Sequence, residues 1–221
     1  MASTINGKII SENWGSWKFG NVYEECHQSF RSQAWMCGRV TLAKDFSDEE
    51  KPKLQKPPET IERKYFIGNA KAKSFAIAVD ARGKLGWKQN EISGDHIIEV
   101  LTEQVSDSYL YYLQQRKISY IFAGKSEIHF DSALRQLTKL FPIKIITLEG
   151  GGSINGSMLK ARLIDEISLL ILPIADATAE TPTVFELVSQ KKKEKFSSNL
   201  QLKEVKKLKH QVLWLKYKIT K

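Results

Sequence analysis

Short apolar runs alternate with segments of helical spacing through the middle of the chain. Apolar runs without a helical period, bounded by polar or glycine-containing turns, predict buried strands. In chain order, these runs are Ala2–Ile5, Ala34–Cys37, Ser74–Asp80, His96–Thr102, Ser119–Ala123, Ile143–Leu148 and Asp165–Leu172. Helical spacing predicts helices over Val22–Ser32, from Ser106 through Leu113, over Phe130–Leu140 and over Gly156–Ala161. Strands that alternate with helices in this way indicate βαβ units, a parallel sheet and right-handed crossovers.

The C-terminal part of the chain departs from that rhythm. Leu213–Ile219 alternates apolar and polar residues as a strand does, and Lys203–Lys209 before it fits either a helix or a strand. We favour an antiparallel hairpin for the two segments. The pattern therefore predicts a single α/β domain, residues 1–221, whose mixed, mostly parallel central sheet ends in a C-terminal antiparallel hairpin.

The most informative stretch is Ile145–Asn155, where an apolar run ends at Glu149. Three consecutive glycines follow: Gly150, Gly151 and Gly152. Ser153 and Asn155 are residue types that cap helix N-termini, so we expect a helix to begin after them. Glycines let a backbone approach an anion closely, and a helix N-terminus offers free N–H groups with a partial positive charge. The stretch therefore predicts either a phosphate cradle or a tight turn that binds nothing.

A second candidate for phosphate binding is Gly38–Thr41, directly after the strand predicted at Ala34–Cys37. It places the Arg39 guanidinium and the Thr41 hydroxyl beside backbone N–H groups. Ligands of open sheets bind at the carboxyl ends of strands, where both candidate segments are expected. Together the two segments indicate a nucleotide site, whereas taken alone Arg39 fits a surface arginine and Thr41 a helix cap.

Composition and charge limit the classes of protein to which the chain can belong. The formal net charge of +9 belongs to residues 190–221, which hold eleven lysines and two glutamates, while residues 1–189 hold 23 basic and 23 acidic residues. A lysine-rich edge strand explains this better than a nucleic-acid surface, because lysines discourage edge-to-edge pairing. Two cysteines without CxxC spacing indicate neither a metal site nor a disulfide framework. Without a signal peptide or a membrane-spanning run, we expect a cytoplasmic protein that binds neither membrane nor nucleic acid.

The motifs and their order resemble the dihydrofolate-reductase-like superfamily, and within it the pyrimidine reductases of riboflavin biosynthesis. In that superfamily a G-R-x-T segment and a G-G turn bind opposite sides of the NADPH pyrophosphate, and they match Gly38–Thr41 and Gly150–Gly152 here. Thr4–Lys8 is similar to the family's N-terminal S-x-D-G-K, with Asn6 in place of the aspartate, and Leu163–Glu166 also fits. The resemblance implies a three-layer dihydrofolate-reductase-like fold, NADPH as the cofactor and a homodimer.

On the cofactor side, the resemblance makes Arg39 the candidate for a cofactor phosphate and Thr41 for the pyrophosphate, which Gly150–Ser153 also faces. Arg82, just after the strand that ends at Asp80, is a second candidate for the adenosine phosphate, although Asp80 repels that group. Thr102 ends the next strand and is a candidate for the adenine ribose, or alternatively a plain strand end.

On the substrate side, the resemblance makes Glu149 the candidate catalytic residue, because the matching glutamate of the family contacts substrate. The alternative is a carboxylate that accepts hydrogen bonds from neighbouring backbone N–H groups. Ser3, Thr4 and Asn6 are candidates for binding the pyrimidine or the ribose, and ordinary turn chemistry is their alternative.

Three functions remain open on the sequence. The first is NADPH-dependent reduction of a ribosylamino-pyrimidine 5′-phosphate, in which a hydride reaches ribose C1 and the sugar opens to a ribityl chain. The second is a reductase of the same fold that acts on another small molecule, such as a pteridine. The third is a non-enzymatic nucleotide-binding protein. The zinc deaminase motifs of the bifunctional reductases do not occur in the sequence.

Overall fold

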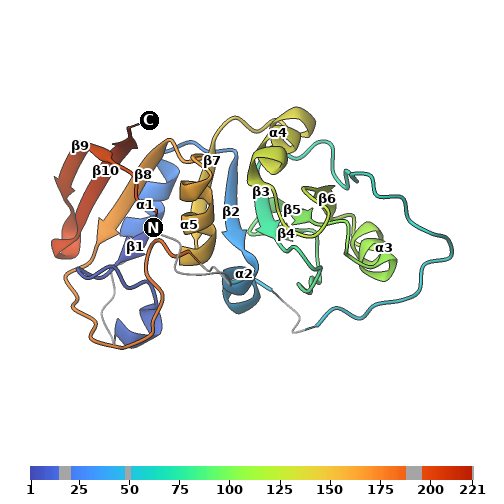
Figure 1. The fold of residues 1–221 in the computed structure, drawn as a ribbon, viewed down its shortest axis with the longest axis horizontal. Coiled ribbons are helices and arrows are strands. Elements are labelled where there is room, and N and C mark those ends of the chain that lie inside the picture. Colours follow the sequence, from blue (N-terminus) through green and yellow to red (C-terminus); the bar gives the residue numbers. More distant parts are fainter. Residues whose placement is uncertain (15–20, 48–50, 188–195, 221) are drawn as a thin grey trace. The chain divides into compact units, whose positions relative to one another are not determined.

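The computed structural model describes residues 1–14, 21–47, 51–187 and 196–220. It divides into two compact units, of which one comprises Met1–Arg31 with Gly150–Lys221 and the other comprises Ser32–Glu149. We call them the terminal unit and the central unit, and Figure 1 labels their helices and strands. The organisation as one domain stays a prediction.

The central unit is built on a six-stranded sheet. Its strands are β2 (Ala34–Gly38), β3 (Phe75–Val79), β4 (Glu91–Ile92), β5 (Asp95–Leu101), β6 (Ser119–Phe122) and β7 (Ile146–Gly150). The strand order is β4-β5-β3-β2-β7, and β6 also pairs with β5. The pairs β2–β3, β3–β5 and β5–β6 are parallel, whereas the short β4 is antiparallel to β5. The predicted parallel pairing is therefore confirmed here.

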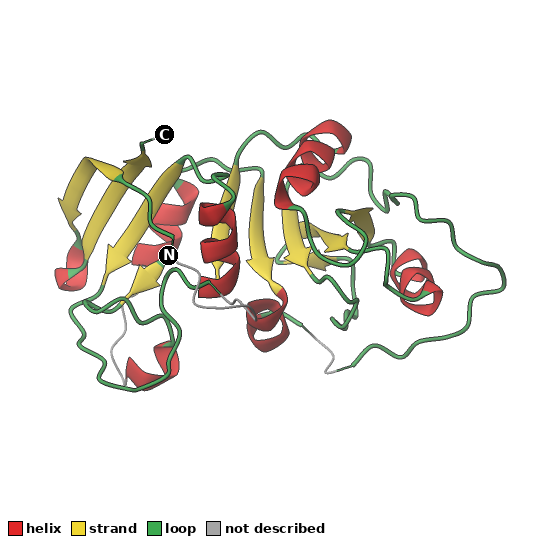
Figure 2. Cartoon of the chain, viewed as in Figure 1, coloured by secondary structure: helices red, strands yellow, loops and turns green. Residues whose placement is uncertain are grey.

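Three helices belong to the central unit: α2 (Arg39–Asp45), α3 (Asp107–Gln115) and α4 (Phe130–Leu140). A buried apolar cluster joins Ala76 and Ala78 of β3, Ile97 and Leu101 of β5, and Tyr109 of α3. This cluster forms because alternate residues of a strand face the same side of a sheet. Figure 2 shows that residues 51–74, between α2 and β3, form neither a helix nor a ladder strand.

The terminal unit contains a four-stranded sheet and two α-helices among its described residues. The strands are β1 (Ala2–Ser3), β8 (Glu166–Ile171), β9 (Leu200–Lys207) and β10 (Leu213–Ile219), in the order β1-β8-β10-β9. β1 is parallel to β8, whereas β10 is antiparallel to both β8 and β9. The C-terminal antiparallel hairpin is thus confirmed, and with it the α/β class with mixed sheets.

Helix α1 (Val22–Gln28) packs on this four-stranded sheet. Its Val22 and Cys26 belong to one buried cluster with Leu170 of β8 and Trp214 of β10. The predicted helix over Val22–Ser32 is therefore shorter than expected, because Ser29 already leaves the helix as its C-cap. Cys26 and Cys37 are both free thiols.

Two local predictions around the glycine turn are wrong. Helix α5 (Gly152–Lys160) begins at Gly152, so Ser153 and Asn155 lie inside the helix and do not cap it. The strand before it extends to Gly150 and is half-buried along most of its length, whereas the sequence suggested a buried strand that ends before Glu149. Ile145 lies outside that strand and is exposed. The apolar pattern alone therefore misplaced this strand by three residues at its start and by two at its end.

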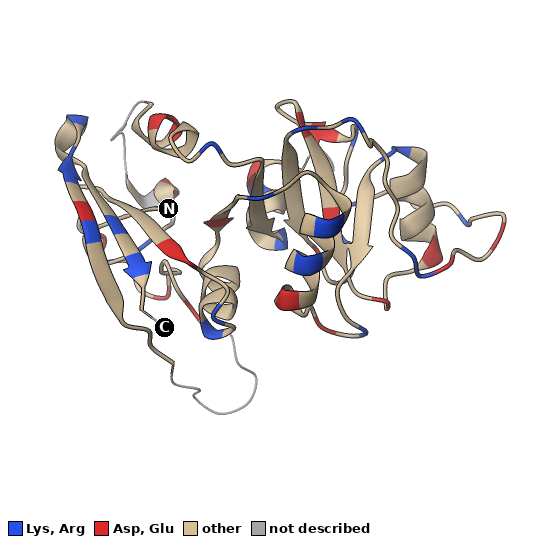
Figure 3. Cartoon of the chain, turned by 90° about the horizontal axis from the view of Figure 1, so that it is seen from above, with Lys and Arg blue, Asp and Glu red and all other residues tan. Residues whose placement is uncertain are grey.

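The basic residues of the C-terminal part line the β9–β10 hairpin, as Figure 3 shows. Glu204 of β9 forms ion pairs with Lys206 of the same strand at 2.7 Å and with Lys216 of β10 at 2.9 Å. Residues 188–195, which carry the other part of the lysine excess, lie outside the described residues. Within the described ranges, no helix is long and apolar enough to cross a membrane.

Candidate functional site

The carboxyl ends of the parallel strands in the central unit carry the first group of candidate residues. Gly38 at the end of β2 pairs with Val79 at the end of β3. Arg39 therefore lies one residue beyond this pair and Arg82 lies three residues beyond it, both exposed and just after neighbouring strands. The structure thus brings the two predicted phosphate-binding arginines to the same edge of one sheet, which is the edge where open sheets bind ligands.

Two predicted hydroxyl groups at this edge differ in their availability. Thr41 lies in the first turn of α2 and is half-buried. Thr102, directly after β5, is fully buried, and its Oγ1 donates a hydrogen bond to the carbonyl oxygen of Ala81 at 2.6 Å. This bond joins the end of β5 to the loop after β3, so the observed role of the Thr102 hydroxyl is to hold the segment that carries Arg82.

The glycine turn in the terminal unit leads directly into α5. Gly151 is the N-cap, and no side chain accepts a hydrogen bond from the first turn of the helix. By contrast, α3 of the central unit is capped by Ser106, whose Oγ accepts from the N–H of Tyr109 at 3.2 Å. The first N–H groups of a helix have no partner within the helix, so the uncapped start of α5 retains donors for an anion. Ser153, in its first turn, is exposed.

The glycines of this segment do not all serve the same purpose. Gly150 has a φ of +110°, which favours glycine, and its peptide bond to Gly151 is cis. A Cβ at Gly152 would overlap the carbonyl oxygen of Thr183, and the N–H of Glu186 donates to the carbonyl oxygen of Gly152 at 3.0 Å. Close packing of residues 183–186 against α5 therefore requires Gly152, independently of any ligand.

The carboxyl group proposed for catalysis, Glu149, lies inside β7 and one residue before its end. It is half-buried, and burial raises the pKa of the Glu149 carboxyl above its usual value. A carboxyl group with a raised pKa at the end of a strand is a frequent feature of reactive sites, although structural carboxyls share it.

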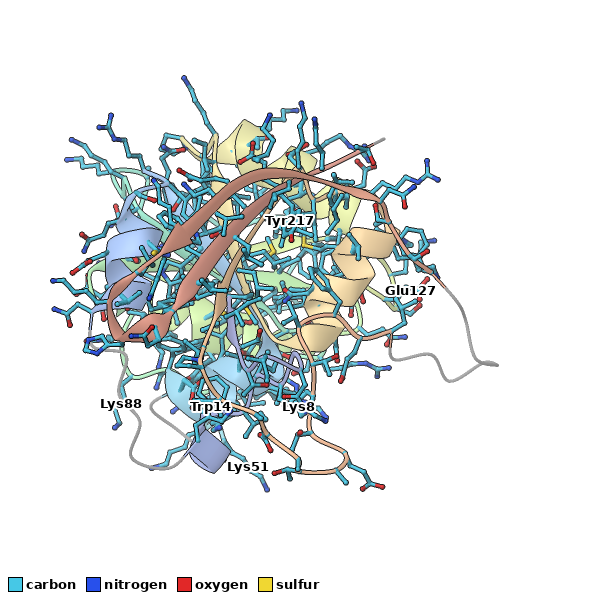
Figure 4. The ribbon with its side chains drawn as sticks, turned by 90° about the vertical axis from the view of Figure 1, so that its left-hand side faces the viewer. Lys8, Trp14, Lys51, Lys88, Glu127 and Tyr217 are labelled. Carbon is cyan, nitrogen blue, oxygen red and sulfur yellow. The ribbon has the colours of Figure 1, made fainter. Side chains whose placement is uncertain are left out.

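The third group of candidates forms one turn near the N-terminus. The Thr4 hydroxyl donates to Asn6 Oδ1 at 2.8 Å and accepts from the Lys8 N–H at 3.0 Å, and Ser3 and Thr4 are both buried. Asn6 Nδ2 donates to the carbonyl oxygen of Asp176 at 2.7 Å. An aspartate has no such donor, which gives a physical reason for asparagine at this position. Lys8 Nζ donates to the Thr181 carbonyl at 3.0 Å, and Figure 4 labels its position.

Comparison with known proteins decides the family. A family model described as the RibD C-terminal domain matches residues 1–214. The chain belongs to this family. A related protein is the 2,5-diamino-6-ribosylamino-4(3H)-pyrimidinone 5′-phosphate reductase of Aquifex aeolicus, which is 31% identical over 83 residues. The aligned stretch covers 38% of this chain and 37% of that protein, so it spans well under two thirds of the relative.

Solved structures share the fold of this RibD C-terminal domain chain. A pyrimidine reductase-like protein from Corynebacterium diphtheriae superposes with a TM-score of 0.73 at 17% identity, over 100% of this chain and 90% of that one. RibD of Acinetobacter baumannii gives 0.66 at 17% identity, over 100% of this chain and 56% of that one. The deaminase/reductase of Thermotoga maritima gives 0.63 at 14% identity, over 99% and 55%. At these identities the likeness shows the fold alone.

One buried residue of this RibD C-terminal domain escaped the sequence reasoning. Glu99 lies in the middle of β5 and is fully buried, with hydrogen bonds to Trp87 and Tyr109. The available signal was a single carboxylic residue inside the apolar run His96–Thr102. Among the described residues, no group of three or more histidine, cysteine, aspartate or glutamate side chains is placed to hold a metal ion.

Proposed function

We propose that this member of the RibD C-terminal domain family is an NADPH-dependent reductase of a 5-amino-6-ribosylamino-pyrimidine 5′-phosphate in riboflavin biosynthesis. Membership of the family and the names of its relatives support this proposal. The observation that carries it is the start of α5, where a glycine turn after β7 leads into a helix with no side-chain cap. Such a start fits a diphosphate, because it combines free N–H donors with the positive end of a helix dipole.

We assign different residues to the different phosphate groups of the cofactor. The N–H groups in the first turn of α5 suit the pyrophosphate, since they have no partners within the helix and no side chain caps them. Arg39 and Arg82 are exposed cations at one sheet edge and suit the remaining phosphate. Thr41, half-buried in the first turn of α2, supplies a hydroxyl beside Arg39.

NADPH, when bound, would supply a hydride to ribose C1 of the substrate, and a proton would complete the reduction to the ribityl product. Glu149 is the residue that we assign to the substrate, because its half-buried carboxyl has a raised pKa and therefore holds or releases a proton closer to neutral pH. Ser3, Thr4 and Asn6 form the turn that we also assign to substrate binding.

Binding of NADPH tests the proposal most directly. A ligand that binds only the native state raises its stability, by about 2.7 kcal/mol when its concentration is 100 times the dissociation constant. We expect saturating NADPH to raise the melting temperature of the wild-type chain, and to do so less for Arg39→Ala. Arg135→Ala is the matched control, since Arg135 lies on α4 and pairs with Asp131 of the same helix. An unchanged melting temperature of the wild-type chain would remove the reductase function.

Turnover assays then separate the substrates. The purified chain is mixed with NADPH and with either the deaminated or the non-deaminated ribosylamino-pyrimidine 5′-phosphate, and loss of NADPH absorbance is followed. We expect oxidation of NADPH with one of the two. Binding of NADPH without turnover on either would indicate a reductase of the same fold with another substrate.

A further inference from the structure

Two carboxyl groups are buried beneath the edge of the central sheet that carries Arg82. Glu99 of β5 and Asp80, the residue after β3, each have no exposed surface. Glu99 alternates with Ile97 and Leu101, which belong to the apolar cluster under α3, so its side chain shares their face of the sheet. Carboxyl groups in such surroundings are costly unless hydrogen bonds or a proton compensate them.

The hydrogen bonds of Glu99 specify where its proton lies. The hydroxyl of Tyr109 is 2.8 Å from the carbonyl oxygen of Leu85 and 2.7 Å from Oε1 of Glu99. A tyrosine hydroxyl has a single hydrogen, and it cannot donate to both oxygens. Both contacts are satisfied when Glu99 is a neutral acid that donates to Tyr109, while Tyr109 donates to Leu85. The same oxygen of Glu99 also accepts from the indole N–H of Trp87 at 2.6 Å.

The surroundings of Glu99 favour the same neutral state. Burial and the nearby Asp80 carboxylate raise the pKa of Glu99 well above its usual value, more than the hydrogen bonds that its ionised form makes with Trp87 and Tyr109 lower it. Oε2 of Glu99 and Oδ1 of Asp80 are buried atoms without a hydrogen-bond partner. Two adjacent buried carboxylates would repel each other, and a proton on one of them removes that repulsion.

The groups that surround this pair hold the loop from Asp80 to Trp87. Oδ2 of Asp80 accepts from the backbone N–H groups of Lys84 and Leu85. Gly83 has a φ of +62°, and a Cβ there would lie 2.5 Å from the ring of Tyr109, so the backbone lies directly on that ring. Three contacts therefore fix the loop. Asp80 accepts hydrogen bonds from its backbone, the ring of Tyr109 packs against it, and Glu99 binds the indole of its last residue, Trp87.

We propose that Glu99 is a positioning residue for the cofactor. As a neutral acid, Glu99 donates a hydrogen bond to Tyr109, which in turn donates to Leu85. Glu99 also accepts a hydrogen bond from Trp87. These bonds fix the loop that carries Arg82. The part of this role that concerns NADPH rests on the function proposed above, whereas the part that concerns the loop does not.

The test compares Glu99→Gln with Glu99→Leu. Both partners bond to Oε1 of Glu99, so glutamine, which is neutral, keeps either an N–H donor for Tyr109 or an oxygen acceptor for Trp87, whereas leucine keeps neither. For Glu99→Leu we expect the Lys84 and Leu85 amides to exchange faster with solvent and the Trp87 indole N–H resonance to shift. We also expect NADPH affinity to fall by about tenfold, the scale of one lost buried hydrogen bond. Glu99→Gln, which keeps one of the two hydrogen bonds, should lie between wild type and Glu99→Leu in all three.

His96→Leu is the matched control for a loss of stability alone. His96 lies on the same strand, is equally buried and bonds to Ser119 at 2.7 Å, but belongs to the opposite end of β5. We expect it to lower the melting temperature and leave the exchange of Lys84 and Leu85 relative to other amides unchanged. Equal loosening of the loop by His96→Leu would overturn the proposal.

A double mutant asks whether Glu99 acts through Arg82. Arg82→Ala should weaken NADPH binding, and adding Glu99→Leu should weaken it little further, because the loop then has no guanidinium to present. Fully additive losses would overturn the proposal, as would a Glu99→Gln variant that behaves like Glu99→Leu. If wild-type protein does not bind NADPH, the proposed function fails, while the exchange and indole measurements still decide whether Glu99 fixes the loop.

Discussion

Glu149 is half-buried inside β7, and this burial raises the pKa of its carboxyl group. Glutamine has nearly the same shape but cannot exchange a proton. For Glu149→Gln we expect NADPH binding to be retained and turnover to fall by on the order of a hundredfold, the scale of a lost acid–base group. Titration with NADPH and steady-state assays measure the two quantities separately. Glu127→Gln, an exposed carboxyl of the central unit, is the control. Unaltered turnover in Glu149→Gln would exclude our role for it.

His96 links the stability of the central unit to pH. Burial lowers the pKa of His96 from its ordinary 6.5, so the folded chain holds the neutral ring while the unfolded chain takes up a proton at about that pH. The contribution of the neutral His96 ring to the free energy of unfolding is therefore complete above pH 6.5. It is lost as the pH falls toward the lower pKa of the folded state, at up to about 1.4 kcal/mol per pH unit.

Urea unfolding between about pH 5 and 7, above the range where most carboxylates titrate, measures this dependence. His96→Gln should flatten the curve, because its amide does not titrate. A slope of the same size in His96→Gln would assign the effect to another group.

Sequence reasoning at the residue scale located side chains whose chemistry is visible in a local motif. Arg39 and Arg82 were found because each follows an apolar run, and the structure places both at one sheet edge. The hydrogen bond from the buried Thr102 hydroxyl to Ala81 could not be predicted from the sequence, since it depends on which strand lies beside β5. Glu99 escaped for the same reason, because its partners Trp87 and Tyr109 come from a loop and a helix.

At the scale of elements, α5 shows that a glycine can be required by packing rather than by a turn. In an ordinary helix interior, replacing glycine by alanine stabilises by about 1 kcal/mol. At Gly156 a Cβ would overlap the backbone of Glu186, so we expect Gly156→Ala to destabilise instead, by about 1–3 kcal/mol. Chemical denaturation measures the change. Ser157→Ala, at the next position of the same helix, should cost less than about 1 kcal/mol.

Elements with a strong pattern were predicted well. The helix over Phe130–Leu140 has the predicted bounds, and β2, β3 and β5 lie within a residue of the apolar runs that predicted them. The start of α5 was missed because a glycine at the first helical position gives no propensity signal. Which strands share a sheet depends on contacts between residues far apart in sequence. The apolar pattern therefore did not predict that the strands divide between two sheets.

At the scale of the whole molecule, one face of the β9–β10 hairpin is open and apolar. Leu213, Leu215, Tyr217 and Ile219 alternate along β10, and Val205, Leu202 and Leu200 lie opposite the last three. Leu202 and Val205 are 51% and 52% exposed. Figure 4 marks Tyr217 on this hairpin. We propose that this face is covered by a second copy of the chain, because exposed apolar surface of this kind usually serves an interface.

Analytical ultracentrifugation tests the self-association. We expect the wild-type chain to sediment as a dimer and the double variant Leu202→Lys with Val205→Lys to sediment as a monomer, since two charges would then have to be buried. Lys218→Gln lies on the opposite face of β10 and is the control. A monomeric wild-type chain, or a dimer that persists in the double variant, would contradict this interface.

The division of the chain into units has a consequence for its synthesis. Residues 1–31 leave the ribosome before the central unit does, yet β1 pairs with β8, and Val22 and Cys26 of α1 pack against Leu170 and Trp214. The whole central unit is made in between, and its sheet draws only on residues up to Gly150. Domains generally fold as units while the chain is still growing. The amino-terminal segment therefore waits without its partners while the central unit folds, and the terminal unit is completed last, from the two ends of the chain.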